Sequence, residues 1–349
     1  MAAYTTIDDP TIYMNPVLYT GNYDTNAITG VGFQPDLVWA KERDGTSSHA
    51  VFDAVRGVQK KIMTNSTDVE STETTYLSAF GADGFTLGAN NGINESGKLN
   101  VAWNWKAGTS FTNDASATGV GDIDSTGSVN TDAGFSIISY TGTGSAGTVA
   151  HGLGVAPKFM IFFNLDGGYN WNTYHSAYSP TQSQEFNTTN AAETNGTAMW
   201  NDTAPTSSVF SLGDAGSVNE SATPIIAYCF TDVAGYSKAG SYIGNSSVDG
   251  TFVYTGFRPA WFLLKNYQDN GDNWCLFDNK RNAFNVTNNG LAPNSSEVEF
   301  TDVDVDFLSN GVKMRNSTGR HNGNGKTYIY MCFSEAPFVN SNGVPCNAR

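Results

Sequence analysis

Three proline-anchored segments decide the fold of this 349-residue chain: GFQPDLVWAK at residues 32–41, GLGVAPKFMIFF at 152–163 and GFRPAWFLLK at 256–265. In each segment a glycine-containing turn signal leads to a proline, which a run of large apolar residues follows. A short apolar run bounded by turn residues predicts a buried β-strand. The same strand signal therefore occurs three times, which indicates an internal repeat.

Related elements flank each of these anchors. A tyrosine-threonine-glycine triplet precedes each one, in LYTGN at 18–22, SYTGTG at 139–144 and VYTGF at 253–257. An aromatic element follows at nearly constant spacing, in SHAVFDAVRG at 48–57, in Tyr174-His175 and in NWCLFDNKRN at 273–282. The triplets and aromatic elements extend the repeat in both directions from the proline.

The closing elements of the repeat also match. They are GFTLGANNGINESGKLNVAWNWKAG at 84–108, VFSLGDAGSVNESATPIIAYCFTDVAG at 209–235 and GVKMRNSTGRHNGNGKTYIYMCFSEAP at 311–337. Each contains a polar turn and then a strand signal with large residues two positions apart. Because side chains alternate between the faces of a strand, each pair is expected on one face of a sheet. The pairs are Trp103 with Trp105, Tyr228 with Phe230, and Met331 with Phe333.

These patterns predict an all-β fold of three tandem β-sandwich-like repeat units. The expected divisions are β unit 1 at 1–108, a Gly/Ser/Thr/Asp-rich linker at 109–134, β unit 2 at 135–235, a second linker at 236–250 and β unit 3 at 251–349. Three such units can surround a pseudo-threefold axis or form a short rod in which each unit touches only its neighbours. The sequence leaves both arrangements open.

Composition excludes several classes of function. The formal net charge is −15, whereas nucleic-acid binding and attachment to anionic lipid both need a basic face. No segment approaches the roughly 18 apolar residues of a membrane span. The first residues, MAAYTTIDDP, lack the basic and apolar regions of a signal peptide. We therefore expect a soluble protein made in a cytoplasm, with no nucleic-acid partner and no membrane insertion.

The cysteines and histidines form no catalytic or metal-binding pattern. The four cysteines lack metal-ligand spacing, and Cys229, Cys275 and Cys332 lie in apolar runs, which predicts reduced thiols in a core. None of the four histidines belongs to an HExxH, HxH or Cys-His motif. We expect no catalytic residue, no cofactor and no metal.

Charged residues recur in two other patterns. Asp53 with Arg56, and Asp278 with Arg281, follow a phenylalanine in the first and third units. Local ion pairs that hold a turn are favoured for them, and ligand contact is the alternative. The segment TDVDVDF at 301–307 places its aspartates on one strand face. An acidic solvent-facing surface is favoured there over a Ca²⁺ site.

The quoted segments also resemble a known family. QPDLVWAKERD, VFDAVRG, DGFTLGANNGINESG and VAWNWKAG in the first unit are similar to a repeat domain of tailed-bacteriophage proteins of the marine phage and cyanophage type, as are FVYTGFRPAWFLLK and TYIYMCFSEAPFVNSNGVPCNAR in the third. Proteins with this domain are described as tail-fibre and virion structural proteins. The resemblance is looser in the second unit. It departs at Cys332 and Cys346, where small residues would be expected.

The resemblance implies a non-enzymatic structural protein on the surface of a tailed-bacteriophage virion, of the tail-fibre or tail-knob type. Its localisation would be the virion, after synthesis in the host cytoplasm, and its partners would be other virion proteins. A capsid (head) decoration protein is the alternative. A lesser alternative is a glycan-degrading, tailspike-like enzyme that uses two carboxylates, for which the candidates are Glu42, Asp44, Glu95 and Glu220. A homo-oligomer stays open.

A virion protein that contacts the host is expected to bind cell-surface glycan through exposed aromatic rings and amides in loops. The candidates are Tyr169, Trp171 and Trp200 in the divergent second unit. The competing interpretation is that these rings belong to a core.

Overall fold

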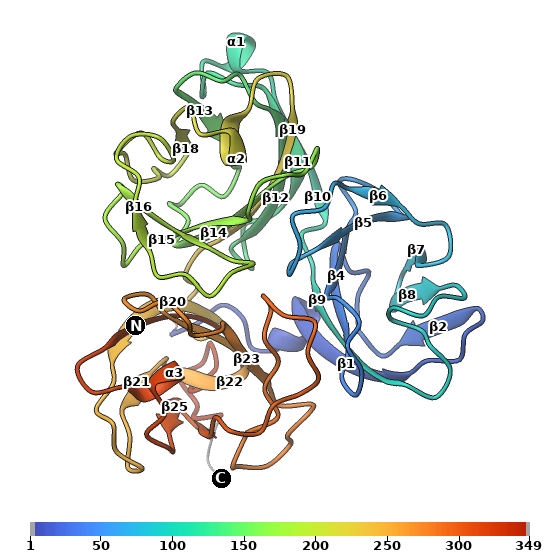
Figure 1. The fold of residues 1–349 in the computed structure, drawn as a ribbon, viewed down its shortest axis with the longest axis vertical. Helices are drawn as coiled ribbons and strands as arrows, with labels where there is room; N and C mark the ends of the chain where they lie inside the picture. Colours follow the sequence, from blue (N-terminus) through green and yellow to red (C-terminus); the bar gives the residue numbers. More distant parts are fainter. Residues whose placement is uncertain (1–3, 347–349) are drawn as a thin grey trace.

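Antiparallel strands form almost all of the regular structure in the computed structural model, which describes residues 4–346. Figure 1 shows three lobes around a common centre, coloured from blue through green to red along the chain. We name them lobe 1 (residues 10–107), lobe 2 (109–230) and lobe 3 (237–337). The predicted all-β class is confirmed, and the arrangement around a centre differs from a rod because lobe 1 also touches lobe 3.

Each lobe pairs one large sheet with one small sheet. In lobe 1 the 3₁₀ helix η1 (Pro10–Ile12) leads into a large sheet whose strand order is β1 (Met14–Thr20), β9 (Leu99–Trp105), β3 (Leu37–Glu42), β4 (Ala50–Asp53), β5 (Lys60–Met63) and β6 (Ser71–Thr72). The small sheet has the order β2 (Asn26–Thr29), β8 (Gly84–Leu87) and β7 (Leu77–Gly81).

Lobe 2 has the largest sheet. Its order is β10 (Thr109–Asn113), β11 (Ser125–Asn130), β12 (Phe135–Thr141), β19 (Pro224–Phe230), β14 (Phe159–Asn164), β15 (Asn172–His175), β16 (Gln182–Glu185) and β17 (Glu193–Thr194). The small sheet pairs β13 (Gly147–Ala150) with β18 (Val209–Leu212). Two short helices complete the lobe, α1 (Ala115–Thr118) and α2 (Gly216–Asn219).

Lobe 3 has the order β20 (Ser237–Ile243), β26 (Thr327–Pro337), β22 (Phe257–Asn266) and β23 (Cys275–Asp278) in its large sheet. Its small sheet has the order β21 (Phe252–Tyr254), β25 (Gly311–Met314) and β24 (Val305–Leu308), and α3 (Gly319–Asn322) lies between β25 and β26 in sequence. The central order is therefore the same in the three large sheets: β1-β9-β3-β4, β12-β19-β14-β15 and β20-β26-β22-β23.

Both faces of each large sheet are buried. In β3, Leu37 and Trp39 face a core that all three lobes share, whereas Val38 and Ala40 face a separate core between the two sheets of lobe 1. Lobes 2 and 3 have corresponding separate cores. This explains why the anchor strands are uninterrupted apolar runs, since a strand with two buried faces needs no polar positions.

The shared core receives the residue pairs that the sequence placed on one sheet face. Its aromatic members include both residues of two pairs, Trp103 with Trp105 and Tyr228 with Phe230, and the third pair adds Met331 with Phe333. Period-two alternation in β9, β19 and β26 turns each pair toward the molecular centre. The predicted orientation of these pairs is therefore confirmed.

A buried asparagine fastens one turn in each lobe. In lobe 1, Asn94 donates to the carbonyls of Asp24 and Gly88 and accepts from the backbone of Asn22. Asn219 in lobe 2 and Asn322 in lobe 3 each make the same set of two donated bonds and one accepted bond to backbone groups. In the polar turns noted in the sequence, the asparagine side chains thus form hydrogen bonds with backbone groups that would otherwise lack partners.

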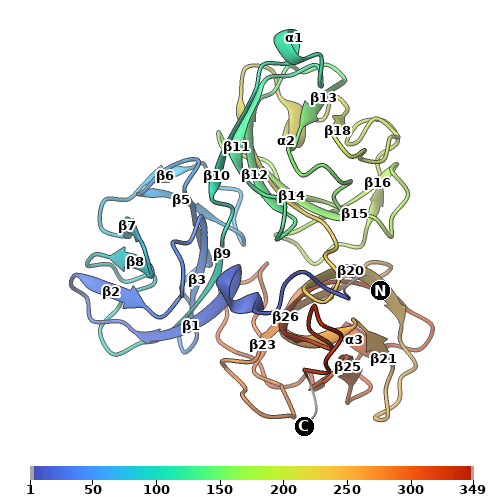
Figure 2. The ribbon, with the colours of Figure 1, turned by 180° about the vertical axis from the view of Figure 1, so that it is seen from behind.

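The ends of the chain close the ring of lobes. Figure 2 shows the N-terminal segment passing from lobe 1 onto lobe 3. Tyr4 donates to the carbonyl of Gly256 at 2.5 Å, and Ile7 is buried in the shared core. The carboxylate of Asp8 accepts from the backbone and the hydroxyl of Ser341. The segment that precedes lobe 1 therefore contacts both lobe 3 and the segment that follows lobe 3.

The two segments expected to be linkers are strands instead. Residues 109–134 contain β10 and β11, which add to the large sheet of lobe 2 through pairing of β11 with β12. Residues 236–250 contain β20, the edge strand of lobe 3. Ser and Thr suggested flexible linkers, but polar side chains are also compatible with strands that have one solvated face. Lobe 3 consequently begins before the predicted residue 251.

The triplet alignment in the third unit was also wrong. Tyr19 and Tyr140 donate to the carbonyls of Ile93 and Val218, and the equivalent bond in lobe 3 runs from Tyr242 to His321. SYIG at 241–244 is therefore the counterpart of the first two triplets. VYTG at 253–256 begins in β21, the counterpart of β2 and β13.

A core shared by three lobes predicts cooperative unfolding. Separating one lobe would expose its face of the shared core, so we expect a single thermal transition in which the calorimetric and van't Hoff enthalpies agree. Differential scanning calorimetry measures both enthalpies. Two or three separable transitions would show that the lobes fold independently.

Candidate functional site

Asp53, at the end of β4, joins lobe 1 to lobe 2. One of its carboxylate oxygens accepts from the backbone N–H groups of Val55 and Arg56, which forms the local turn. The other oxygen lies 2.6 Å from Arg56 Nε and accepts from the Tyr228 hydroxyl of lobe 2 at 2.7 Å. The ion pair is buried, so the hydroxyl adds a hydrogen bond to a carboxylate shielded from water.

Asp278 does the same between lobe 3 and lobe 1. It accepts from the backbone of Lys280 and Arg281, and its second oxygen lies 2.5 Å from Arg281 Nε. That oxygen also accepts from Trp103 Nε1 of lobe 1 at 2.9 Å. The two ion pairs predicted from sequence are confirmed, and each also joins two lobes.

His175 takes the corresponding position between lobe 2 and lobe 3. Its Nδ1 accepts from the backbone of Ala177, as the aspartates accept from their own turns. This leaves Nε2 as the protonated nitrogen, which donates to the Tyr330 carbonyl of lobe 3 at 3.1 Å. The residue of lobe 3 equivalent to Tyr228 and Trp103 is Met331, which has no N–H or O–H to donate. A histidine donor is therefore suited to this boundary, where an aspartate would lack its donor from the next lobe.

Further polar contacts connect the lobes in the opposite direction. Trp171 of lobe 2 donates to the carbonyls of Met63 and Ser66 in lobe 1, both at 3.1 Å. Trp274 of lobe 3 donates to the carbonyl of Glu185 in lobe 2 at 3.0 Å. Each tryptophan lies four residues before His175 or Asp278. The short element that contains His175 or Asp278 therefore contacts one neighbouring lobe through that residue and the other neighbouring lobe through its tryptophan.

The boundary between lobe 3 and lobe 1 has its own additional contacts. The Thr64 hydroxyl donates to the Pro293 carbonyl at 2.7 Å. Arg43 binds both carboxylate oxygens of Glu299, at 2.7 and 3.2 Å. This two-pronged geometry fixes the orientation as well as the distance between the lobes.

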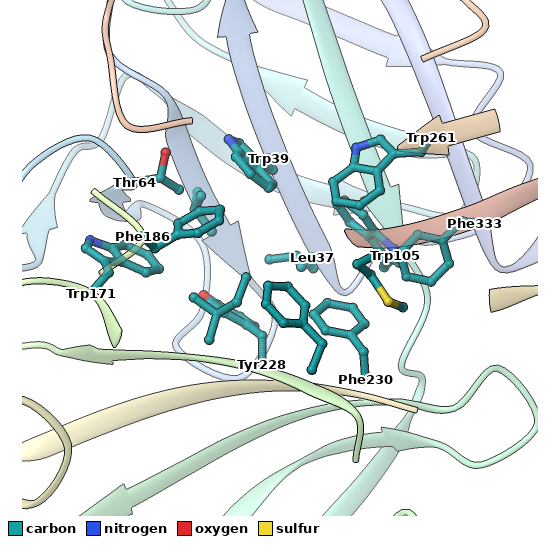
Figure 3. Close-up of a pocket in the computed structure, with 14 residues that line it drawn as sticks. Leu37, Trp39, Thr64, Trp105, Trp171, Phe186, Tyr228, Phe230, Trp261 and Phe333 are labelled. Carbon is teal, nitrogen blue, oxygen red and sulfur yellow. The ribbon is translucent and has the colours of Figure 1, made fainter. Parts of the chain in front are cut away.

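Aromatic rings from all three lobes surround a small cavity at the centre. Figure 3 shows the side chains that line it, among them Leu37 and Trp105 of lobe 1, Phe230 of lobe 2, and Trp261 and Phe333 of lobe 3. Its volume is about 30 Å³, and its walls are apolar. An apolar cavity of this size stays dry. We interpret it as a packing defect beside Leu37, the smallest of three equivalent residues, the other two being Phe159 and Trp261.

The titratable groups at the junction are all engaged in contacts within and between the lobes. Burial lowers the pKa of His175 to about 4, so it is neutral at physiological pH. The aspartates are each bound to an arginine and a neighbouring lobe. Within residues 4–346, no three His, Cys, Asp or Glu side chains lie together in a group that could hold a metal ion.

The structure separates the three predicted glycan-binding residues. Trp171 is 1% exposed in the shared core, and Trp200 is 1% exposed in the separate core of lobe 2, where it packs on Phe162 and Tyr174. The prediction that these two rings face a ligand was wrong, because their indoles fill cores and donate to backbone carbonyls. Tyr169 is only partly buried and lines an open groove.

This groove, which we call the lobe 2 groove, is lined by Gly168, Tyr169, Asn170, Asn172, Ser183, Glu185, Glu193, Met199 and Ser217. Its volume is about 250 Å³. Strands β15, β16 and β17 supply one part of the wall, and α2 supplies Ser217. The groove combines an aromatic ring, a thioether, amides, hydroxyls and carboxylates, a mixture that suits a polar organic ligand.

The amides of this groove were not among the residues predicted from the sequence. Asn170 and Asn172 flank Trp171, and period-two alternation turns them to the opposite side once Trp171 points into the core. That signal was available in GYNWNTYH at 168–175. To use this pattern, one must know which of the three residues is buried. Because Trp171 was predicted to be exposed, the same alternation would turn its two asparagine neighbours toward the core.

Other predicted features have clear outcomes. Cys229, Cys275 and Cys332 are buried free thiols, as predicted, and Cys346 is an exposed one. In the acidic segment 301–307, Asp302 and Asp306 form ion pairs with arginines of lobe 3. Only Asp306 of the three aspartates lies in a strand, β24, so the prediction that they share one strand face was wrong.

The fold and the junction define a class: a three-lobed all-β protein whose buried charged and aromatic groups hold its lobes together. The chain belongs to the family called domain of unknown function DUF7483, whose family profile matches residues 9–337. Neither the curated proteins nor the solved structures contain a match to it.

Removing the Tyr228 hydroxyl tests the contact between lobes 1 and 2. Tyr228→Phe removes one of the two side-chain donors to the same oxygen of the buried Asp53 and leaves only Arg56 Nε. Because the lost hydrogen bond is to a charged group, we expect the free energy of unfolding to fall by about 1.5–3 kcal/mol. Chemical denaturation measures the change. Tyr23→Phe is the matched control, because Tyr23 is 50% exposed and its loss should change stability by less than about 0.5 kcal/mol. Equal effects of the two variants would contradict the proposed role.

The buried His175 predicts a specific pH dependence. In the folded protein its pKa is about 4, whereas in the unfolded chain it is about 6.5. Between these values the unfolded chain binds a proton that the folded protein does not, so stability falls as the pH falls. His175→Gln keeps a donor for Tyr330 and removes this titration. Relative to the variant, the wild type should lose up to about 1.4 kcal/mol per pH unit across this window. Parallel stability curves, measured by denaturation at several pH values, would rule this out.

Proposed function

We propose that this protein is a non-enzymatic structural component of the surface of a tailed-bacteriophage virion, of the tail-fibre or tail-knob type, that takes part in host-surface recognition. The resemblance of its anchor and closing segments to a repeat domain of phage virion proteins supports the proposal. Its partners are other virion proteins, and its localisation is the virion.

The main observation in support of the proposal is that the recurring polar side chains form contacts within the protein itself. The Asp53 and Asp278 ion pairs and His175 are all engaged in contacts between lobes. The recurring asparagines hold backbone turns. A protein whose repeated polar groups serve its own cohesion is suited to a rigid structural role, whereas an enzyme needs positioned groups left free to react.

The carboxylates considered for glycan hydrolysis give that alternative little support. Glu42 is paired with Lys98 at 3.2 Å, and Glu220 accepts hydrogen bonds from Asn164 and Tyr169. Asp44 accepts from the backbone of Leu99 at 3.1 Å. Glu42, Asp44 and Glu95 belong to lobe 1, and Glu220 belongs to lobe 2. We therefore propose no hydrolytic activity.

Two other features bear on the expected partners of this protein. The formal net charge of −15 disfavours binding to phosphate backbones. No helix within residues 4–346 is long and apolar enough to cross a bilayer.

A head decoration protein is the second candidate. The three lobes surround one centre (Figure 1), a shape that suits a seat on a local threefold position of a capsid. The tail assignment is placed first because the family resemblance favours it.

The number of copies per particle tests both assignments. Quantitative mass spectrometry of purified particles, with the major capsid protein as the internal standard, gives this number, and immunogold labelling gives the location. We expect a few to a few dozen copies at the tail. Hundreds of copies on the head would support decoration instead, and absence of the protein from particles would refute the virion role.

A further inference from the structure

The lobe 2 groove occupies a position that the other lobes fill with apolar residues. Asn172 lies three residues before His175, and the residues three before Asp53 and Asp278 are Ala50 and Cys275. Ala50 and Cys275 are buried in the separate cores of their lobes. Asn172 is 3% exposed, and its amide lines the groove.

Glu185 is a second substitution of the same kind. It pairs with Asn172 across β15 and β16, as Met63 pairs with Ala50 across β4 and β5. Lobe 2 therefore has a polar pair where lobe 1 has an apolar one. Placing polar groups at such a position costs free energy unless they are hydrogen bonded. Both residues are hydrogen bonded here, Asn172 to the Asn170 carbonyl and Glu185 through both of its carboxylate oxygens.

The groove wall is held rigidly by its own hydrogen bonds. One oxygen of Glu185 accepts from Asn170 at 2.5 Å, and the other accepts from Thr188 and Asn190 at 3.0 and 2.9 Å. Asn170 in turn accepts from Asn187 at 2.8 Å. These bonds fix the amide of Asn170 and the carboxylate beside it before any ligand arrives, which lowers the entropic cost of binding.

The aromatic wall is fixed in the same way. The Tyr169 hydroxyl donates to Glu220 at 3.2 Å, and the other oxygen of Glu220 accepts from Asn164 at 3.1 Å. Gly216 lies directly beneath the tyrosine, because a Cβ there would approach the hydroxyl to 2.4 Å. The Tyr169 ring thus packs against Gly216, the first residue of α2, and borders the groove.

Several hydrogen-bonding groups on the wall have capacity left for a ligand. Asn172 Nδ2 donates to the Asn170 carbonyl, while Asn172 Oδ1 has no donor among residues 4–346. The Ser217 hydroxyl donates only to the thioether of Met199, at 3.6 Å, and a thioether is a weak acceptor. Glu193 is exposed at the edge of the groove. A ligand rich in hydroxyl groups would satisfy all three.

We propose that the lobe 2 groove binds one ring of a neutral sugar, with the Tyr169 ring against its C–H face and Asn172 and Ser217 hydrogen bonded to its hydroxyls. The volume of about 250 Å³ is below the roughly 300–1,000 Å³ of sites for drug-sized ligands, so it suits a single ring. Glu185 and Glu193 line the groove in a chain of net charge −15, which disfavours uronic and sialic acids. The inference rests on the proposed function only for the source of the sugar, a cell-surface glycan.

Saturation-transfer difference NMR on the full chain tests the site directly. The probes are free neutral hexoses, N-acetylhexosamines and hexuronic acids at millimolar concentration, each followed by titration. We expect transfer to at least one neutral sugar, and at least tenfold weaker binding in both Asn172→Ala and Tyr169→Ala. Asn172→Ala introduces the residue that lobe 1 has at this position, so the fold should accept it. Asn91→Ala is the control, because Asn91 is exposed in lobe 1 and should leave binding unchanged.

Each outcome decides the inference. No transfer to any neutral sugar, stronger binding of uronic acids, or binding that both groove variants retain would overturn it. Thermal unfolding of each variant shows whether a loss of binding reflects a loss of folding; if Asn172→Ala unfolds, Ser217→Ala provides the same test at the groove wall. Sugar binding by a protein absent from virions would leave the site intact and refute the virion role, so the two failures are distinguishable.

Discussion

The three large sheets depend on one constraint, which is that each must bury both of its faces. One face is covered by the small sheet of its own lobe, and the other can be covered only by the large sheets of the neighbouring lobes. Trp105, Phe230 and Phe333 occupy equivalent positions on β9, β19 and β26, and their rings pack on one another near the molecular centre. Edge-to-face contacts of this kind add about 0.5–1.5 kcal/mol each beyond the burial of the rings. The aromatic core therefore unites the lobes, and the hydrogen bonds set their relative orientation.

Those hydrogen bonds follow one pattern at two of the three boundaries between lobes and a different pattern at the third. Asp53 reaches forward to Tyr228 and Asp278 reaches forward to Trp103, so each aspartate finds an N–H or O–H on the next lobe. At the third boundary, Met331 offers none, and His175 donates to a backbone carbonyl instead. Histidine also preserves the turn after the strand, because its Nδ1 accepts the same backbone bond as an aspartate oxygen. Lobe 2 thus lacks the Asp/Arg pair, but His175 still makes the contact with the next lobe, through a backbone carbonyl in place of a side-chain donor.

Much of the fold could be predicted from the sequence, because strand signals are local. The anchors gave β3, β14 and β22, and alternation gave the core-facing residues of β9, β19 and β26. The linkers were mistaken because Ser- and Thr-rich strands with a solvated face resemble flexible segments in composition. Trp171 and Trp200 were misplaced for another reason. Lobe 1 covers Trp171, and Phe162 and Tyr174 cover Trp200 within lobe 2, so neither contact is contained in the local sequence. The groove residues Asn170 and Asn172 were hidden by the same uncertainty, since their direction follows from that of Trp171.

The edges of the sheets show how each of the three lobes avoids pairing with other chains. In lobe 1 the edge strand β1 contains Pro16, which has no N–H to offer a further strand. In lobe 3 the equivalent β20 contains Lys238 and Gly240, residues that discourage edge-to-edge association. The equivalent β12 of lobe 2 contains none of these, and β11 and β10 cover it instead. Lobe 2 therefore protects this side of its sheet with additional strands, while its other side extends through β16 and β17 into the groove wall. The lobe that departs most from the shared strand pattern is thus also the one whose strands form the lobe 2 groove.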